Sequence, residues 1–240
     1  MEKNRKPKYK RVLLKISGEA IGGPDSVFDL EIVKRIASEI ALVQKKGVEI
    51  GLVIGGGNII RGEKLAGYGL DRNMSDYMGM TATIINGLLF ESILKSIGAP
   101  VILQSALHID TVTESIDLNK TAFYLSDKTI VIFAAGTGNP YFTTDTAAAL
   151  RALEINAQVF IKATKVDGVF DKDPEVHDDA RFYKTLTYND VLDRNLTVMD
   201  MTAISLCRDG NLPVRVFNIN QSGNIVRIVM GDNLGTYIKE

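Results

Sequence analysis

The sequence predicts an α/β protein in which a mainly parallel sheet is covered by helices on both faces, a three-layer αβα sandwich with right-handed crossovers. Short apolar runs of strand length alternate with segments of helical periodicity, and three of these runs end in turns rich in small residues. The chain has 240 residues and 45% hydrophobic content, enough to bury a large core as one domain or as two closely fused lobes.

The elements expected up to residue 162 follow from this alternation. They are a strand from 12 that ends in a turn at 19, a helix at 29–46, a strand at 48–54, one long helix or two joined helices at 71–98, a strand at 100–103, a strand at 129–134, a helix at 144–154 and a strand at 157–162. The helix at 29–46 is indicated by apolar residues at helical spacing and by the glycine that ends it. The residues expected to face inward from the long helix are Met74, Met78, Ile85, Leu89 and Ile93.

The last third of the chain departs from this rhythm. Residues 165–174 are dense in turn formers and predict a hairpin with an exposed loop. The elements expected after it are helices at 188–194 and 199–209, a strand at 214–217, a helix at 224–230 and a final edge strand at 236–238. We therefore expect a single domain, 1–240, with a soft boundary between two lobes near residue 160 and no flexible linker.

Composition narrows the class of protein. The net charge of −1 gives no general attraction to nucleic acid, and the basic residues among the first eleven indicate a solvated tail rather than an arm for a polyanion. One cysteine, Cys207, excludes an internal disulfide and suits a reducing cytosol. We expect neither a secretory signal nor a membrane span, because the basic start is followed only by a short apolar strand that Lys15 interrupts.

A glycine triplet, Gly55 to Gly57, follows the strand at 48–54 and leads to Arg61. Glycine lets backbone N–H groups close on an anion, the next helix adds its positive end, and Arg61 can bind two oxygens at once. The alternative is a tight turn between strand and helix. Two other strand ends repeat the arrangement, after Lys15 and after residue 134, which favours one phosphate-binding crevice at the carboxyl edge of a parallel sheet.

Several common site signatures are absent from the sequence. It contains neither the Walker A pattern nor a glycine-rich dinucleotide fingerprint after a strand, and it has no nucleophile elbow. His108, His177 and the distant Cys207 make a protein zinc site improbable.

The motifs together resemble the bacterial UMP kinases, which belong to the amino-acid kinase fold group with the carbamate kinases. The resemblance covers nearly the whole chain. The segments that carry it are Lys15–Glu19, 53–58 with Arg61 and Gly62, Asp71-Arg72 with 76–80, 136–145, 162–169 and 198–200. The segments at 76–80 and 137–144 are specific to members that accept a nucleotide.

The resemblance implies phosphoryl transfer from ATP to UMP, giving UDP and ADP, in pyrimidine nucleotide biosynthesis in the cytoplasm. It implies an acceptor and phosphate lobe, 1–160, and an ATP-binding lobe, 161–240. Magnesium is expected to come with ATP, because Mg²⁺ keeps waters and favours substrate oxygens, and we assign it no protein ligand.

Three residues are expected to be catalytic. Lys15 and Arg61 would neutralise the transferring phosphoryl group, assisted by backbone N–H groups of Gly18 and the glycine triplet. By resemblance Asp145 orients the lysine, although an acid in the first turn of a helix can simply complement the helix dipole. No general base is needed, because the acceptor phosphate is already an oxyanion.

The resemblance also assigns the two nucleotide sites. The residues expected to bind ATP are Lys15, Ile16, Ser17, Gly18, Gly57, Arg61, Thr164, Phe170 and Asp173. Phe170 can pack on adenine, although an aromatic residue in a hairpin can equally be core. The residues expected to bind UMP are Gly56, Asp76, Thr137, Gly138, Asn139, Pro140, Tyr141, Phe142, Thr143 and Thr144. Asp76 can accept from both ribose hydroxyls, and Thr137 or Asn139 could select uracil over cytosine.

Regulation and assembly are expected from the resemblance alone. It implies a homo-hexamer, feedback inhibition by UTP and allosteric activation by GTP, but the segment 20–29 departs from the family's usual Gly-Phe-Gly and puts the GTP response in doubt. Met74, Met78 and Met80 could pack across a subunit interface or within the core. Two alternatives remain: a kinase for a carboxylate or carbamate, and a non-catalytic nucleotide or oxyanion binder on the same fold.

Overall fold

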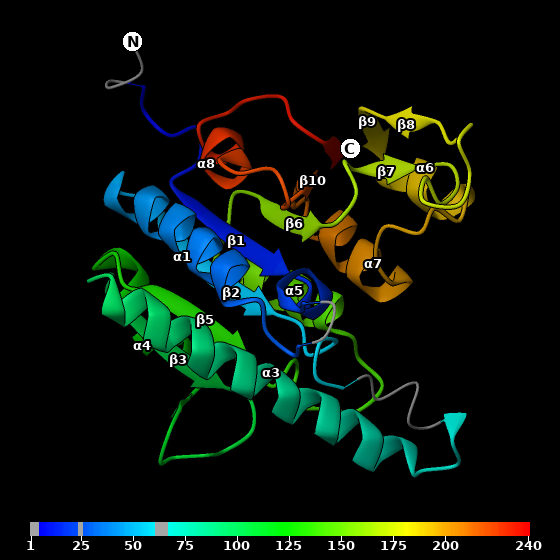
Figure 1. Ribbon diagram of the computed structural model, residues 1–240. Coiled ribbons are helices and arrows are strands. Elements are labelled where there is room, and N and C mark those ends of the chain that lie inside the picture. The colour runs from blue at the N-terminus through cyan, green and yellow to red at the C-terminus, as the bar shows by residue number, and fades with distance from the viewer. Residues whose placement is uncertain (1–4, 24–25, 61–66) are drawn as a thin grey trace.

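One sheet of nine strands forms the centre of the protein (Figure 1). We describe residues 5–23, 26–60 and 67–240 of a computed structural model. Across the sheet the strands are β4 (Glu114–Ser115), β3 (Val101–Ser105), β5 (Ile130–Ala134), β2 (Glu49–Ile54), β1 (Arg11–Ile16), β6 (Phe160–Thr164), β10 (Val214–Asn218), β11 (Thr236–Lys239) and β9 (Thr185–Thr187). Every neighbouring pair is parallel except β10 and β11, so the expected mainly parallel sheet is confirmed.

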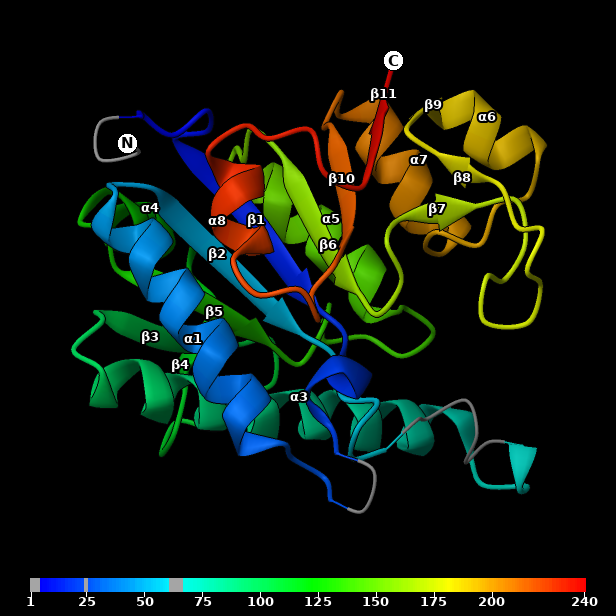
Figure 2. The same ribbon diagram turned by 45° about the horizontal axis from the view of Figure 1, so that its top comes forward.

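Helices cover both faces of this sheet, which confirms the three-layer αβα arrangement (Figure 2). One layer contains α3 (Arg72–Ser96), α1 (Leu30–Lys45) and α8 (Asn224–Val229). The other contains α4 (Leu118–Ser126), α5 (Thr144–Glu154), α7 (Met201–Asp209) and α6 (Tyr188–Asp193). A short 3₁₀ helix, η1 (Gly18–Ile21), follows β1, and β7 (Val169–Phe170) and β8 (Phe182–Tyr183) form the predicted hairpin.

The strands in the middle of the sheet are buried on both faces, as parallel strands between helices must be. Along β1, Val12, Leu14 and Ile16 join the core under α1, α3 and α8, whereas Leu13 joins the core under α5 and α7. Because side chains alternate along a strand, Lys15 lies on the same face as Leu13, at a position that is otherwise apolar. A cation is thus built into the centre of the sheet.

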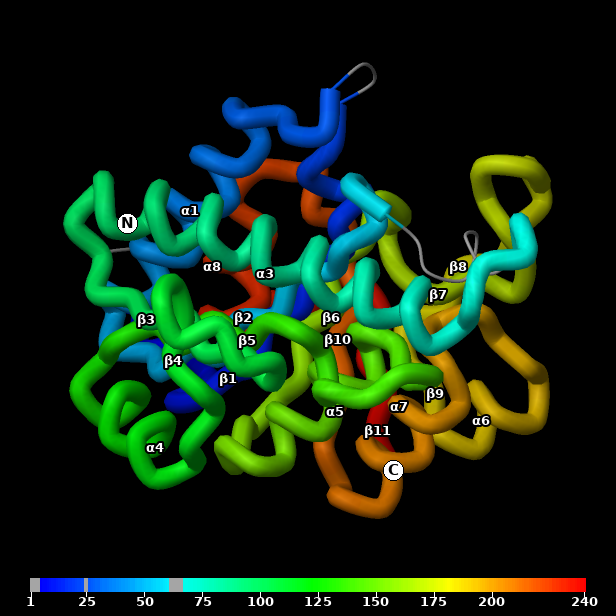
Figure 3. Tube along the Cα trace, turned by 90° about the horizontal axis from the view of Figure 1, so that it is seen from below, coloured from blue at the N-terminus to red at the C-terminus, as the bar shows by residue number. Residues whose placement is uncertain are grey.

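The segment 71–98 forms one helix, α3, which is the longest element and extends beyond the ends of β3 and β5 (Figure 3). The expectation for its inward face was wrong in part: Met74, Met78 and Ile85 are exposed, while Leu89 and Ile93 pack at the edge of the core. The buried residues of α3 are mostly small, including Ala82, Thr83, Asn86 and Gly87.

Close approach explains this small-residue face. A Cβ added to Gly87 would lie 2.7 Å from Leu103 Cδ1, and one added to Gly56 would lie 2.8 Å from Gly79 O. Large side chains would therefore push α3 away from β3 and from the loop after β2. By length and composition α3 could cross a membrane, but it packs on β3, β5 and α1 as a core helix.

Most element boundaries differ from the sequence-based expectation by one or two residues, and two differences are larger. The strand placed at 157–162 begins at Phe160, and Thr236–Lys239 is not an edge strand, because β9 pairs with its outer side. The two residues Phe182 and Tyr183 complete a hairpin whose loop is longer than 165–174 alone. The division into lobes near residue 160 stays a prediction.

Candidate active site

The candidate active site lies at the carboxyl ends of β1, β2, β5 and β6, which point to the same edge of the sheet (Figure 1). From β1 the chain continues into β2 on one side, and it later returns to form β6 on the other side. Such a switch in strand order leaves a crevice where open α/β sheets bind ligands.

Two lysines and one carboxylate form the centre of this crevice. Lys15 on β1 and Lys162 on β6 are register partners, so they lie directly opposite each other on adjacent strands. Asp145 lies between them: its Oδ1 is 2.7 Å from Lys15 Nζ and its Oδ2 is 2.6 Å from Lys162 Nζ. Lys162 also donates to the backbone carbonyl of Val198. Each lysine is less than a tenth exposed.

Burial disfavours the charged forms of these three side chains, and the attraction between their opposite charges favours them. Burial alone would raise the pKa of Asp145, but the positive charges of Lys15 and Lys162 hold that pKa far below its usual range. Burial lowers the pKa of Lys162, as does the charge of Lys15, while Asp145 acts in the opposite direction. With both lysines protonated, the group has an excess of one positive charge, which a phosphoryl group can complement.

Capping of helix α5 fixes the position of Asp145. Thr143 caps the helix, since its side chain accepts from the backbone N–H groups of Asp145 and Thr146, each at 3.1 Å. Asp200 caps α7 by accepting from Ala203 N at 2.9 Å, and it also accepts from the hydroxyls of Thr143 and Thr146. Asp200 therefore ties the starts of two helices together beside the lysines.

The glycine loops after β1 and β2 are in direct contact. A Cβ added to Gly18 would lie 2.6 Å from Gly57 N and 2.7 Å from Gly55 O, so only glycine allows this approach. Asn86 from α3 donates to Gly55 O at 2.6 Å and to Asn58 Oδ1 at 2.7 Å, which fixes the loop after β2. This geometry is compatible with both interpretations of the glycine triplet, a tight turn and a backbone site for an anion.

Among the other residues expected near ATP, Ile16 is buried in the core, so only its backbone can face a ligand. Ser17, the next residue, is the N-cap of η1. Arg61 and Gly62 lie outside the described residues.

An unusual backbone connects β5 to the predicted acceptor loop, residues 137–144, and continues into it. Positive φ angles occur at Ala135, Gly136, Gly138 and Tyr141, with values of 61°, 60°, 79° and 71°. Thr83 on α3 stabilises the first of these by accepting from Ala135 N at 2.7 Å. Such a backbone turns successive N–H groups toward the same side, as in anion-binding nests.

Asp76 brings helix α3 to this loop. Its Oδ2 accepts from Tyr141 N at 2.9 Å and pairs with Arg72 Nε at 2.8 Å. The guanidinium of Arg72 lies 5.5 Å from the centre of the Tyr141 ring. Two segments far apart in sequence are thus joined, as expected for one nucleotide site.

The remaining acceptor residues lie on the same loop. Thr137 and Asn139 bond to each other through side chains and backbone, and Tyr141 and Phe142 are exposed. Pro140 lies between these two pairs in the sequence.

The predicted donor residues Thr164, Phe170 and Asp173 follow β6. Thr164 ends the strand, and its hydroxyl donates to Val166 O at 2.8 Å. Phe170 packs edge-on against Phe182, with ring centres 5.4 Å apart, and lies between two cavities. One cavity, of about 370 Å³, includes Asp173 in its wall. The other, of about 380 Å³, lies between the hairpin and the segment after β10. Phe170 therefore lines both cavities and is only partly buried.

Five residues of the site were not assigned a role from the sequence: Lys162, Asp200, Arg72, Thr83 and Asn86. The first three lie inside motifs that the resemblance uses, and their chemistry was visible there. The sequence did not show which residues they contact, because strand register and helix packing decide which side chains meet.

Comparison with known proteins gives concordant results. A model of the amino acid kinase family matches residues 10–218. A uridylate kinase from Methylococcus capsulatus is 51% identical over 233 residues, which cover 97% of this chain and 98% of that protein. A crystal structure of UMP kinase from Bacillus anthracis superposes with a TM-score of 0.92 at 39% identity, covering 96% of each chain. The structure of UMP kinase from Ureaplasma parvum gives a TM-score of 0.91 at 37% identity, covering 97% of this chain and 100% of that one.

Proposed function

The chain belongs to the amino acid kinase family, among its uridylate kinases, and on this basis we propose that it transfers the terminal phosphoryl group of ATP to UMP, giving UDP and ADP. The observation that carries the proposal is the Lys15–Asp145–Lys162 group, which lies in the crevice between the glycine loops and the acceptor loop. A buried excess of positive charge at this point suits two anionic substrates that must meet phosphate to phosphate.

The mechanism is positioning and charge neutralisation. Lys15 contacts the transferring phosphoryl group, and Lys162 adds a second positive charge from the neighbouring strand. Asp145 orients both ammonium groups, and its charge opposes the lowering of the Lys162 pKa by burial. Arg61 is assigned to the phosphates of both substrates. The acceptor oxygen of UMP is already anionic, so no side chain has to remove a proton.

The acceptor site is assigned to Asp76, the backbone of Gly56 and residues 137–144. The Asp76 carboxylate accepts from the ribose hydroxyls, and its bond to Tyr141 N holds the loop against α3. Thr137 and Asn139 read the edge of uracil, where the N3–H donor and O4 acceptor are the reverse of the pattern in cytosine.

The donor site is assigned to the glycine loops and to Thr164, Phe170 and Asp173. The cavity of about 370 Å³ beside Phe170 receives adenine, with Asp173 accepting from the ribose. Among the residues described here, no group of three His, Cys, Asp or Glu side chains could hold a metal ion. Asp145 and Asp200 are engaged by lysine, threonine and backbone groups. Magnesium is proposed to enter with ATP, whose phosphate oxygens it favours, and when bound it would neutralise phosphate charge.

Assembly and regulation belong to the same proposal. The enzyme is a cytoplasmic homo-hexamer of pyrimidine biosynthesis and is inhibited by UTP, which binds in the acceptor site. Activation by GTP is not assigned. Exposed Met74, Tyr77, Met78 and Ile85 on α3 offer an apolar surface for contact between subunits.

The test is ADP release by the purified protein with Mg-ATP and each of UMP, dUMP, CMP, AMP, GMP, aspartate, acetylglutamate and carbamate. Turnover with UMP, much weaker with dUMP and CMP, is the expected result. Turnover only on a carboxylate or carbamate would identify a different kinase of this fold. ATP binding without turnover on any acceptor would identify a non-catalytic binder.

A further inference from the structure

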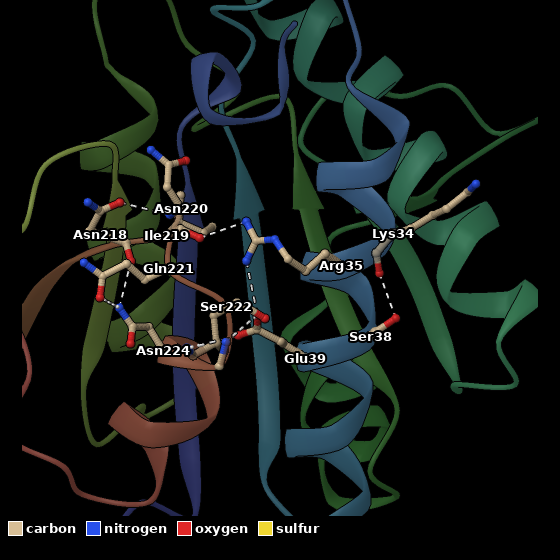
Figure 4. Close-up of polar contacts among 12 residues, drawn as sticks. Lys34, Arg35, Ser38, Glu39, Asn218, Ile219, Asn220, Gln221, Ser222 and Asn224 are labelled. Atoms are coloured by element: carbon tan, nitrogen blue, oxygen red, sulfur yellow. Dashed lines mark hydrogen bonds and ion pairs between the residues drawn. The ribbon is translucent and has the colours of Figure 1, made fainter.

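Helix α1 contains none of the residues assigned to the active site, yet two of its side chains hold the segment between β10 and α8 (Figure 4). Arg35 Nη2 donates to Ile219 O at 2.9 Å. Glu39 Oε1 accepts from Gly223 N at 2.8 Å, and its Oε2 accepts from Ile225 N at 3.3 Å. Arg35 Nη1 and Glu39 Oε1 are 3.2 Å apart. We call Arg35 and Glu39 the α1 brace.

The α1 brace caps the start of α8, which has no capping side chain of its own. Gly223 precedes the helix with a φ of 86°, and it has no side chain to cap the first N–H groups. Glu39, only 8% exposed, takes that role from another helix. A buried carboxylate that accepts from two backbone N–H groups and an arginine is well satisfied and holds its partners firmly.

One connection runs from the brace to Thr164. Ile219, whose carbonyl Arg35 binds, donates its own N–H to Thr164 O at 2.9 Å. The hydroxyl of Thr164 lies 3.3 Å from Phe217 O in β10, just before this segment. Arg35 is thus two hydrogen bonds away from a residue assigned to ATP.

A second connection runs to the hairpin that carries Phe170. Asn224, the first residue of α8, donates to Asn218 O at 3.1 Å, and Asn218 Nδ2 donates to Asp167 Oδ1 at 2.9 Å. Asp167 lies just before β7, and its side chain, with those of Asn218, Asn224 and Phe170, lines the cavity of about 380 Å³. Phe170 also lines the cavity that includes Asp173.

We propose that Arg35 and Glu39 are positioning residues for the donor nucleotide. By fixing the 218–224 segment they fix Thr164 through Ile219 and Phe170 through Asp167, although neither touches a substrate. The inference rests on the proposed function, since it concerns the affinity of the same donor site. It makes α1 part of the ATP site and leaves the acceptor site, on α3 and the 137–144 loop, independent of the α1 brace.

The test is the Glu39→Gln variant. Glutamine has the same size, but it has one acceptor oxygen and its NH₂ would face a backbone N–H. We expect KM for ATP to rise about five- to tenfold, the usual net effect of losing about one hydrogen bond, with KM for UMP changed by less than about twofold. The matched control is Glu31→Gln on the same helix, which removes only the exposed ion pair with Lys34 and should change neither constant.

Calorimetric titration with the non-hydrolysable analogue AMP-PNP, without UMP, should show the same weakening for Glu39→Gln. If that variant does not fold, Arg35→Lys carries the test, because it loses the bond to Ile219 O and leaves the Glu39 contacts to α8 in place. Unchanged AMP-PNP affinity, or equal changes in both KM values, would overturn the inference. Because the titration needs no turnover, it decides the inference even if the wild-type protein fails to phosphorylate UMP.

Discussion

Lys15 and Lys162 lie directly opposite each other on adjacent parallel strands and share a single carboxylate, that of Asp145. Two buried ammonium groups at such positions would repel each other strongly without an anion between them. The carboxylate makes the pair possible, and the remaining positive charge is directed to the crevice where the glycine loops meet. The same three side chains therefore bear on both stability and phosphoryl transfer.

Replacing Lys15 with alanine should lower kcat by about two to three orders of magnitude, the usual effect of removing one preorganised donor to a transition state. Steady-state ADP release at saturating ATP and UMP measures this. Lys34→Ala, at an exposed position on α1, serves as the control and should leave kcat unchanged. Near-normal turnover of the Lys15 variant would remove this residue from the mechanism.

Replacing Asp145 with asparagine should reduce both activity and stability. Removing one partner of a buried ionic group typically costs about 3–5 kcal/mol, because the other charges remain buried without compensation. Urea unfolding at pH 7 gives the free energy of unfolding. A stability loss with full activity would mean that Asp145 only complements the helix dipole and the core.

The stability difference between the wild type and the Asp145→Asn variant should depend on pH in one direction. The folded protein holds the pKa of Asp145 below the unfolded value of 3.8, so the stabilisation is fully present above that value. It is lost as pH falls through the folded pKa. The difference in free energy of unfolding should thus be constant from about pH 5 to pH 7 and narrow below about pH 4. A difference that grows on acidification would contradict this assignment.

Replacing Asp76 with asparagine should raise KM for UMP about tenfold or more, the cost of a charged hydrogen bond, and leave KM for ATP unchanged. It should also reduce the preference for UMP over dUMP, because the ribose hydroxyls lose their acceptor. The measurement is the ratio of kcat/KM for the two acceptors. An unchanged ratio would show that Asp76 serves only to hold Tyr141.

Cys207 should be inert in the folded protein. It is fully buried on α7, and burial, with the negative charges of Asp145 and Asp200, raises the pKa of its thiol to about 12. Reaction with a disulfide reagent at pH 8 should be negligible in buffer and complete in urea. Rapid labelling of the native protein would show that α7 separates from the core and that the contacts of Asp200 with α5 then break.

Local patterns in the sequence predicted most elements, because helix caps, glycine stops and apolar periodicity act over a few residues. The helix at 144–154 has its predicted bounds, since Thr143 caps it through hydrogen bonds to residues two and three positions away. The motifs, which occur in the same order as in the family, predicted membership of that family, and the comparisons support this prediction. Lys15 and Asp145 were singled out in the same way.

Only the tertiary structure decided which of these residues meet. The pairing of Lys162 with Lys15 depends on strand register, and the inward face of α3 depends on how closely that helix approaches β3. The α1 brace joins residues about 185 positions apart, as in the bond from Gly223 to Glu39, and no local pattern encodes such a contact. By itself the sequence determined the elements and the chemistry available; packing over long sequence distances determined the site, because a hydrogen bond requires its two atoms to be brought within about 3 Å.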